Sequence, residues 1–180
     1  MTAIKSILNP RSVAVVGASN DPAKLTGRPI AYLQAQGFDG TIYPINPRYD
    51  EIAGLKSYAS AIDLPEAPDL GLILVGANRV IEAVRDLAAK GTKAAVVLAS
   101  GFGEAGEEGR ARQEQLREAA GEMRILGPNT IGLVNITDRI PLTASGAMES
   151  DNFPVGSVAL LSQSGGILGS LLSRAVARGI

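Results

Sequence analysis

Gly17, Ala18 and Ser19 are the residues of this chain best suited to holding a phosphate. They follow directly on the apolar run at 12–16, whose β-branched residues predict a strand buried on both faces. Small residues let a ligand approach the backbone, and in a doubly wound α/β fold the first turn after a strand lies against a nucleotide's phosphates. The same residues also suit an ordinary tight turn between a strand and a helix.

The glycine spacing differs from the dinucleotide fingerprint, Gly-x-Gly-x-x-Gly with an acidic residue at the end of the second strand. Here the glycine that follows Gly17 is Gly27. The expected second strand ends in Asn46, Pro47 and Arg48, without an acid. Because a cation there attracts a phosphate on the ribose, the pattern indicates NADP or coenzyme A (CoA). The alternative for Arg48 is a solvated loop charge.

A second anion site is expected at Ser164, Gly165 and Gly166, which precede a helical pattern at 167–178. Backbone N–H groups at a helix N-terminus, together with the helix dipole, attract anions. The chain has no His and no Cys. This composition excludes from it a His base, a phosphohistidine, thiolate metal sites and a Cys nucleophile.

Five apolar runs predict the strands that position these clusters. Each run ends in small or polar residues, and helical patterns lie between the runs. Strands that alternate with helices indicate βαβ units, and parallel sheets bind ligands beyond the carboxyl ends of their strands. The sequence therefore predicts an α/β protein with a Rossmann-like, doubly wound parallel sheet. The strands are expected at 12–16, 41–45, 70–75, 94–98 and 157–161, and the helices at 28–36, 106–122, 167–178 and between an N-cap at Asn78 and a C-terminal Gly91.

The periodic pattern is lost at 138–154, where Ser, Thr, Gly, Pro and Asn are frequent, as in a linker. We therefore expect a Rossmann-like domain at 1–140, a linker at 141–156 and one strand–helix unit at 157–180. A single unit of that kind cannot bury its own apolar faces. The tail is accordingly interpreted as the truncated start of a second domain.

Composition excludes several classes of protein. Of the 180 residues, 46% are hydrophobic and 19% charged, as in a globular protein. The net charge is −1 without a basic block, which argues against nucleic acid as a partner. The N-terminus lacks the apolar core of a signal peptide, and no apolar run approaches the ~18 residues of a membrane span. We expect a soluble, cytoplasmic protein with no membrane partner; homo-oligomer formation stays open.

Five motifs in order resemble one known family. They read Gly-Ala-Ser-Asn-Asp-Pro-Ala-Lys (17–24), Tyr-Pro-Ile-Asn-Pro-Arg-Tyr (43–49), Ser-Gly-Phe-Gly-Glu (100–104), Gly-Pro-Asn-Thr-Ile-Gly (127–132) and Ser-Gln-Ser-Gly-Gly (162–166). Together they resemble the N-terminal part of the NDP-forming acyl-CoA synthetases, relatives of the succinyl-CoA synthetase α subunit. The resemblance implies a CoA-binding Rossmann-like domain followed by a flavodoxin-like domain with a phosphorylated His. It also implies an ATP-grasp portion or β subunit elsewhere, which takes ATP or GTP with Mg.

The resemblance also implies roles for individual residues. The turn at 17–19 and Lys24 would meet the CoA phosphates, and Asn46, Pro47 and Arg48 its adenosine end. The helix opened by Ser164, Gly165 and Gly166 would face the phosphohistidine. Gly76 departs from the family's usual Val-Pro-Ala, and Phe102 is as well suited to plug the core as to contact a ligand. Residues implied beside the rest of CoA are Val75, Gly76, Ala77, Ser100, Gly101, Phe102 and Asn129.

Three functions follow from these features. The first is the CoA-binding segment of an NDP-forming acid–CoA ligase, which makes acyl-CoA through an acyl phosphate and a phosphohistidine that lies outside this chain. Without the His, this segment alone is not expected to be catalytically competent. The second is a stand-alone CoA-binding protein, or the synthetase-like regulatory region of a larger acetyltransferase. The third, an NADP-dependent oxidoreductase, is disfavoured by the missing glycine pattern.

Overall fold

A five-stranded parallel sheet forms the centre of the molecule. The computed structural model describes residues 2–149 and 153–179, and its sheet has the order β2-β1-β5-β6-β7. All neighbouring strands of this sheet are parallel, which confirms the Rossmann-like α/β prediction. The strands are β1 (Ser12–Val16), β2 (Thr41–Ile45), β5 (Leu70–Ile73), β6 (Ala94–Val97) and β7 (Arg124–Leu126).

The three central strands are buried on both faces, as their unbroken apolar sequences predict. Every residue of β1, β5 and β6 is buried. Gly71 in β5 lets a helix approach closely, because a Cβ at this position would overlap Cδ1 of Leu87. Strand β7, at the sheet edge, is three residues long and half exposed, and no apolar run in the sequence predicted it.

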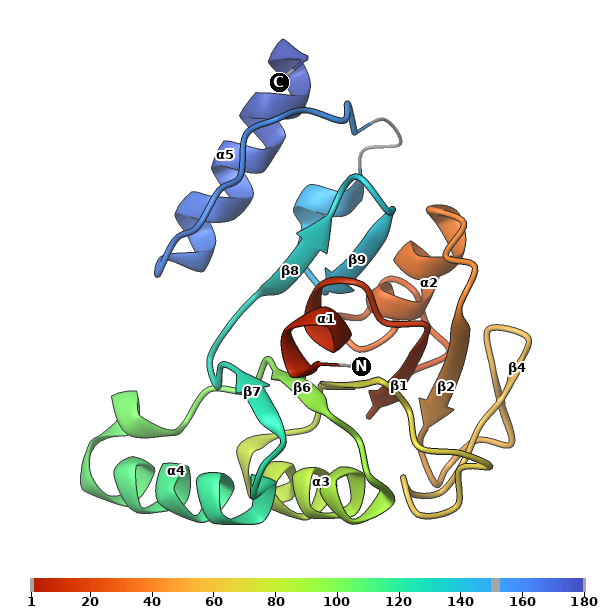
Figure 1. Ribbon diagram of the computed structural model, residues 1–180, viewed down its shortest axis with the longest axis vertical. Helices are drawn as coiled ribbons and strands as arrows, with labels where there is room; N and C mark the ends of the chain where they lie inside the picture. Colours follow the sequence, from red (N-terminus) through yellow and green to blue (C-terminus); the bar gives the residue numbers. More distant parts are fainter. Residues whose placement is uncertain (1, 150–152, 180) are drawn as a thin grey trace.

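Helices cover both faces of the sheet (Figure 1). On one face, α3 (Ala77–Lys90) and α4 (Gly106–Ala120) bury Val80, Val84, Leu87 and Leu116 against the strands. On the other face lie α1 (Ala3–Leu8), α2 (Arg28–Ala35) and a hairpin of β8 (Gly132–Asn135) and β9 (Ile140–Thr143). Two-sided covering makes the sheet doubly wound. The remaining elements before the C-terminal part are β3 (Glu51–Ile52), β4 (Leu55–Lys56), and the 3₁₀ turns η1 (Gly103–Ala105) and η2 (Gly146–Glu149).

The N-cap of helix α3 lies two residues before the predicted one. Its N-cap is Gly76, with an extended backbone, so the prediction of Asn78 as N-cap is wrong. Gly91 ends the helix in the left-handed conformation with φ +97°, as predicted.

The predicted linker at 141–156 begins inside a buried strand. Residues of β9 are all buried, and Ile140 and Leu142 belong to the core on the α2 face. The hairpin with β8 supplies the hydrogen bonds that an isolated polar stretch would lack. Residues 140–143 are therefore part of the first unit, and residues 150–152 of the predicted linker lie outside the described residues.

The C-terminal part is organised differently from the sheet. The strand predicted at 157–161 does not form: these described residues are irregular and exposed, Leu161 by 97%. A parallel strand needs a neighbour for its hydrogen bonds, and no strand that the structure describes lies beside it. The predicted helix does form, as α5 (Gly165–Arg178). It lies beyond the β8–β9 hairpin (Figure 1) and contacts η2.

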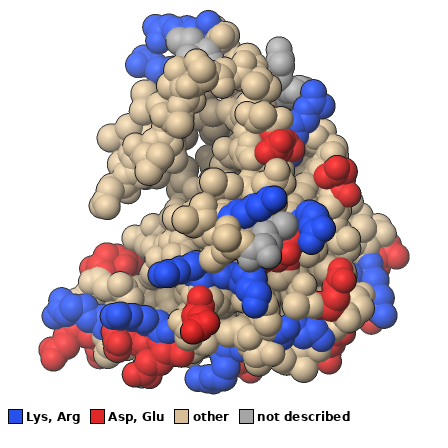
Figure 2. Space-filling view, viewed as in Figure 1, with Lys and Arg blue, Asp and Glu red and all other residues tan. Residues whose placement is uncertain are grey.

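Charge is distributed unevenly over the visible face. Figure 2 shows Lys and Arg mixed with Asp and Glu over the part that contains α3 and α4, while the part formed by α5 is largely uncharged apart from its C-terminal end. No helix in the described ranges has the length and apolarity that crossing a membrane requires.

Candidate functional site

The strand order places four predicted loops around one crevice. The order reverses at β1, which lies between β2 and β5. In open α/β sheets such a switch point, at the carboxyl ends of the strands, is where ligands bind. The predicted residues 17–19, 46–48, 75–77 and 100–102 follow β1, β2, β5 and β6 at this edge.

Gly17 brings the backbone of the first turn against the loop after β5. Its φ is +85°, and its N–H donates to the carbonyl of Ile45 at 2.8 Å. A Cβ at this position would lie 2.7 Å from Cγ1 of Val75. Only glycine meets both conditions. Ala18 beside it is buried and packs in the core on the α2 face.

The loop between this turn and α2 is held by its own hydrogen bonds. Ser19 donates its N–H to the carbonyl of Thr26 at 3.1 Å, and its hydroxyl accepts from the N–H of Asp21 at 3.2 Å. Lys24 lies 3.6 Å from the Asp21 carboxylate, and its side chain is 68% exposed. An exposed pair of this kind is weak, so Lys24 remains available to an anion.

Asn46 ties the loop after β2 to the first turn. Its Nδ2 donates to the carbonyl of Ala18 at 2.8 Å, and its Oδ1 accepts from the N–H of Arg48 at 3.1 Å. Both ends of the amide are thus used within the protein. The amide fixes Arg48 relative to Gly17, although these residues are far apart in the sequence.

Arg48 is the exposed cation of this loop. No salt bridge joins it to any other residue in the described part of the chain. Pro47 beside it is exposed as well. A guanidinium on a loop that Asn46 holds in place suits a phosphate, which it can bind through two parallel N–H donors.

The loop after β5 leads straight into α3. Gly76 has φ −63° and ψ 158°, and no described side chain caps the helix. This φ is the one that proline adopts, so the backbone follows the family's Val-Pro-Ala pattern even though the proline is missing. Val75 is buried, whereas no side-chain hydrogen bond caps the N-terminal N–H groups of α3 among the residues that the structure describes.

Polar side chains hold the loop after β6 from several directions. Glu104 Oε1 accepts hydrogen bonds from the N–H of Gly101 at 2.6 Å and of Phe102 at 3.3 Å, and Arg112 donates to the Gly101 carbonyl. Hydrogen bonds from the backbone N–H of Glu104 itself and of Gly101 lower the pKa of this carboxyl group. From the sequence, Glu104 belongs to the motif at 100–104 without being given a role, and Arg112 is not singled out, because the sequence does not show which backbone groups these side chains reach.

Phe102 and Ser100 have opposite environments in this loop. Phe102 is fully buried in the core on the α3 face, so its side chain plugs the core. Ser100 is exposed. Of the two roles that the sequence left open for Phe102, the structure therefore supports the packing role.

Asn129 extends the same edge toward β7. It has φ +57°, is exposed, and donates its N–H to the carbonyl of Ala99 at 2.8 Å. The backbone bond fastens this loop to the one after β6. The Asn129 side chain is left at the surface.

Ser164, Gly165 and Gly166 lie apart from the crevice but next to the loop after β7. Ser164 caps α5, its hydroxyl accepting from the N–H of Ile167 at 3.4 Å. A Cβ on Gly165 would lie 2.6 Å from Cγ2 of Ile131. Between α5 and η2 lies a cleft of about 430 Å³, lined by Ile131, Ser145, Gly146, Ala147, Gly165, Gly166, Gly169, Ser170 and Ser173.

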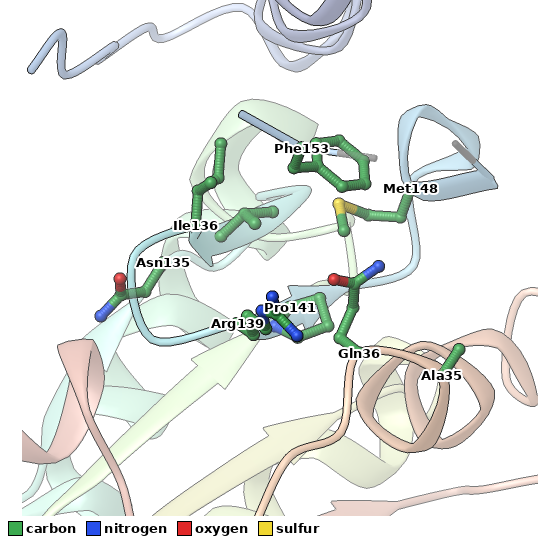
Figure 3. A pocket seen from close by; sticks show the side chains of 9 residues that line it. Ala35, Gln36, Asn135, Ile136, Arg139, Pro141, Met148 and Phe153 are labelled. Carbon is green, nitrogen blue, oxygen red and sulfur yellow. The ribbon is translucent and has the colours of Figure 1, made fainter. Parts of the chain in front are cut away.

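A separate cavity of about 150 Å³ lies between the end of α2, the β8–β9 hairpin and Met148 (Figure 3). None of the binding residues predicted from the sequence lines it. Its polar groups are Gln36, Asn135 and Arg139, and its other lining residues are apolar or small: Ala35, Val134, Ile136, Pro141, Met148 and Phe153.

A comparison with protein families identifies the type of this domain. Residues 11–136 match the family described as a CoA binding domain. The chain belongs to this family. Membership confirms the resemblance stated from the motifs, and it confirms CoA as the ligand of this type of domain.

Individual relatives of this CoA-binding domain are longer proteins. The chain is 39% identical over 180 residues to trans-feruloyl-CoA synthase FCS1 from an unknown prokaryotic organism, covering 98% of this chain and 26% of that protein. It is 39% identical over 162 residues to the α subunit of acetate–CoA ligase [ADP-forming] II from Pyrococcus furiosus, covering 88% and 34%. The chain thus spans about a quarter to a third of these relatives.

A solved structure extends the likeness to the arrangement of elements. The apo form of the dinucleotide forming acetyl-coenzyme A synthetase 1 of Ca. Korarchaeum cryptofilum superposes with a TM-score of 0.89 at 37% identity. The match covers 98% of this chain and 38% of that one. The likeness therefore includes α5 as well as the CoA-binding domain.

Proposed function

We propose that this chain is the CoA-binding segment of an NDP-forming acid–CoA ligase. The observation that carries the proposal is the gathering of the loops at 17–19, 46–48, 75–77 and 100–102 at the switch point of a domain whose family binds CoA. The likeness to acid–CoA ligases over 88–98% of the chain supports the larger protein.

CoA is proposed to lie across the crevice with its nucleotide end at β1 and β2. Backbone N–H groups of Gly17–Ser19 and the cation of Lys24 would meet the pyrophosphate, and Arg48 the 3′-phosphate. The pantetheine arm would then run past Val75, Gly76 and Ala77. From there it would continue along Ser100, Gly101 and the Phe102 backbone to Asn129. The supporting feature is the exposure of Lys24, Arg48, Gly76, Ser100 and Asn129.

The proposed reaction of the whole ligase joins a carboxylic acid to CoA while ATP or GTP becomes its diphosphate. An acyl phosphate and a phosphohistidine are the intermediates of the family, and the His lies outside this chain, which contains none. The N-terminus of α5 is the proposed phosphate site. Ser164 caps it there, Gly166 is exposed, and Gly165 packs closely against Ile131.

The proposed partner is the remainder of such a ligase, including its ATP-grasp portion or β subunit, in the cytoplasm. Residues 157–179 would begin its flavodoxin-like domain. None of the 14 residues described in α5 is buried, and Ile167 and Leu171 are 57% and 42% exposed. Such apolar exposure on a whole helix is typical of a surface that another element covers. Self-association is the competing explanation of this surface.

Calorimetric titration of the 180-residue chain with CoA, 3′-dephospho-CoA and NADP tests the binding proposal. We expect CoA to bind most tightly, and Arg48→Ala to weaken CoA about tenfold without changing the affinity for 3′-dephospho-CoA. Arg117→Ala, which removes an 81% exposed Arg on α4, is the matched control and leaves both affinities unchanged. Tighter binding of NADP than of CoA would refute the proposal.

A further inference from the structure

Two charged side chains hold opposite sides of one peptide segment in the loop after β6. Glu104 Oε1 accepts from the N–H of Gly101 at 2.6 Å, and Arg112 donates to the carbonyl of the same residue. Glu104 is in η1 and Arg112 in α4. The backbone of Gly101 is thus hydrogen-bonded to a carboxylate and to a guanidinium that come from different elements.

The two contacts hold Gly101 in a backbone conformation that glycine allows and that other residues rarely adopt. Gly101 has φ +96°, and a Cβ there would lie 3.4 Å from Cβ of Ala77 at the start of α3. Gln113 adds a third contact, its Oε1 accepting from the N–H of Gly103 at 2.9 Å. Because Phe102 is fully buried, the loop is held by packing in the core as well as by the hydrogen bonds of Glu104 and Arg112.

The Glu104 carboxylate also occupies backbone N–H groups of the loop after β6 that could otherwise bind an anionic ligand. Successive backbone N–H groups around a left-handed residue form a concavity that binds anions. Here the donors of Gly101 and Phe102 already bind Glu104. A phosphate would find these donors taken and a negative charge beside them.

We propose that Glu104 and Arg112 are positioning residues that shape the Gly101 loop for the neutral pantetheine arm and close it to phosphate. This inference rests on the proposed binding of CoA. It goes further in assigning a role to Glu104 and Arg112, which receive none from the sequence alone. The ligand's anionic groups are then confined to the β1 and β2 side, where Lys24 and Arg48 are exposed.

The test compares CoA with adenosine 3′,5′-bisphosphate, which keeps the 3′-phosphate but lacks the pantetheine arm. We expect Glu104→Ala to weaken CoA about tenfold and to change the affinity for the bisphosphate less than twofold. Glu104→Gln keeps an oxygen acceptor at the same place and restores most of the CoA affinity. Arg112→Ala repeats the selective loss, whereas Arg48→Ala weakens both ligands.

The matched control is Glu107→Ala, which removes an exposed carboxylate from the first turn of α4 and leaves both affinities unchanged. Equal losses of CoA and of the bisphosphate in Glu104→Ala would overturn the proposal, because they would indicate a general loss of structure. Unchanged CoA binding in Glu104→Ala would overturn it as well. If Glu104→Ala does not fold, the same comparison with Arg112→Ala decides. Failure of the wild-type chain to bind CoA would instead refute the proposed function.

Discussion

The loops after β2 and β6 lie at the same edge of the sheet but are held by different chemistry. A neutral amide, that of Asn46, holds the loop after β2 and leaves the Arg48 charge free. Ionised side chains hold the loop after β6, so the charges of Glu104 and Arg112 are used inside the protein. In the proposed site, the free charge of Arg48 therefore suits the loop after β2 to a phosphate of the ligand, whereas the loop after β6 has no free charge to offer among its described residues.

The largest expected effect comes from changing Gly17, in the turn after β1 to which the Asn46 amide is hydrogen-bonded. Gly17→Ala places a Cβ 2.7 Å from Val75 in a residue with φ +85°. Left-handed strain and overpacking together should lower the free energy of unfolding by about 2–4 kcal/mol. Urea denaturation measures this loss, and CoA titration should show no binding in the folded fraction.

Gly37→Ala is the control for the Gly17 variant. Gly37 also has positive φ, +70°, but nothing lies within 4 Å of its Cβ position. It should therefore lose only the strain contribution, about 1 kcal/mol. Equal losses at the two positions would contradict the importance of the close approach to Val75.

Removing the amide should separate the β2 loop from the first turn. Asn46→Ala loses the bonds to Ala18 and Arg48, so we expect CoA affinity to fall about tenfold. Since the amide acts by placing Arg48, the loss should be much smaller in an Arg48→Ala background. A double-mutant cycle by calorimetry measures this coupling, and fully additive losses would show that Asn46 acts independently of Arg48.

The smallest expected effect is a pH dependence of the free energy of unfolding that arises from Glu104 in the loop after β6. The folded-state pKa of Glu104 is lowered from its ordinary 4.5. Its stabilisation is therefore fully present above pH 4.5 and is lost as the pH falls through the lower, folded-state value. Because Glu104 is exposed, solvent screens much of the effect.

Urea denaturation of the wild type and Glu104→Gln between pH 7 and pH 3 measures this dependence. The stability difference between them should narrow as the pH falls below 4.5. The difference between the wild type and Asn46→Ala should stay constant, because an amide does not titrate. A wild type–Glu104→Gln difference that is constant over this range would contradict an ionised carboxylate in the β6 loop.

The sequence predicts the parts of the fold that depend on local pattern. Unbroken apolar runs identify β1, β2, β5 and β6, and small residues after them identify the loops of the crevice. Pattern fails where a partner decides the outcome. The run at 157–161 is as apolar as a strand but has no described neighbour to bind, whereas Ile140 to Thr143, in a stretch expected to be a linker, form a strand because β8 pairs with them.

In the candidate site, too, the sequence predicts some features and the tertiary structure decides others. The types of residue at Gly17, Arg48 and Gly101, and the absence of His, determine by themselves that this chain can hold a phosphorylated cofactor and cannot carry a phosphohistidine. Only the tertiary structure decides that the Asn46 amide forms hydrogen bonds with Ala18 and Arg48. The same holds for the hydrogen bonds of Glu104 and Arg112 to Gly101. The physical reason is that hydrogen-bond donors and acceptors are satisfied by whatever folding brings within reach, and a sequence pattern does not specify those partners.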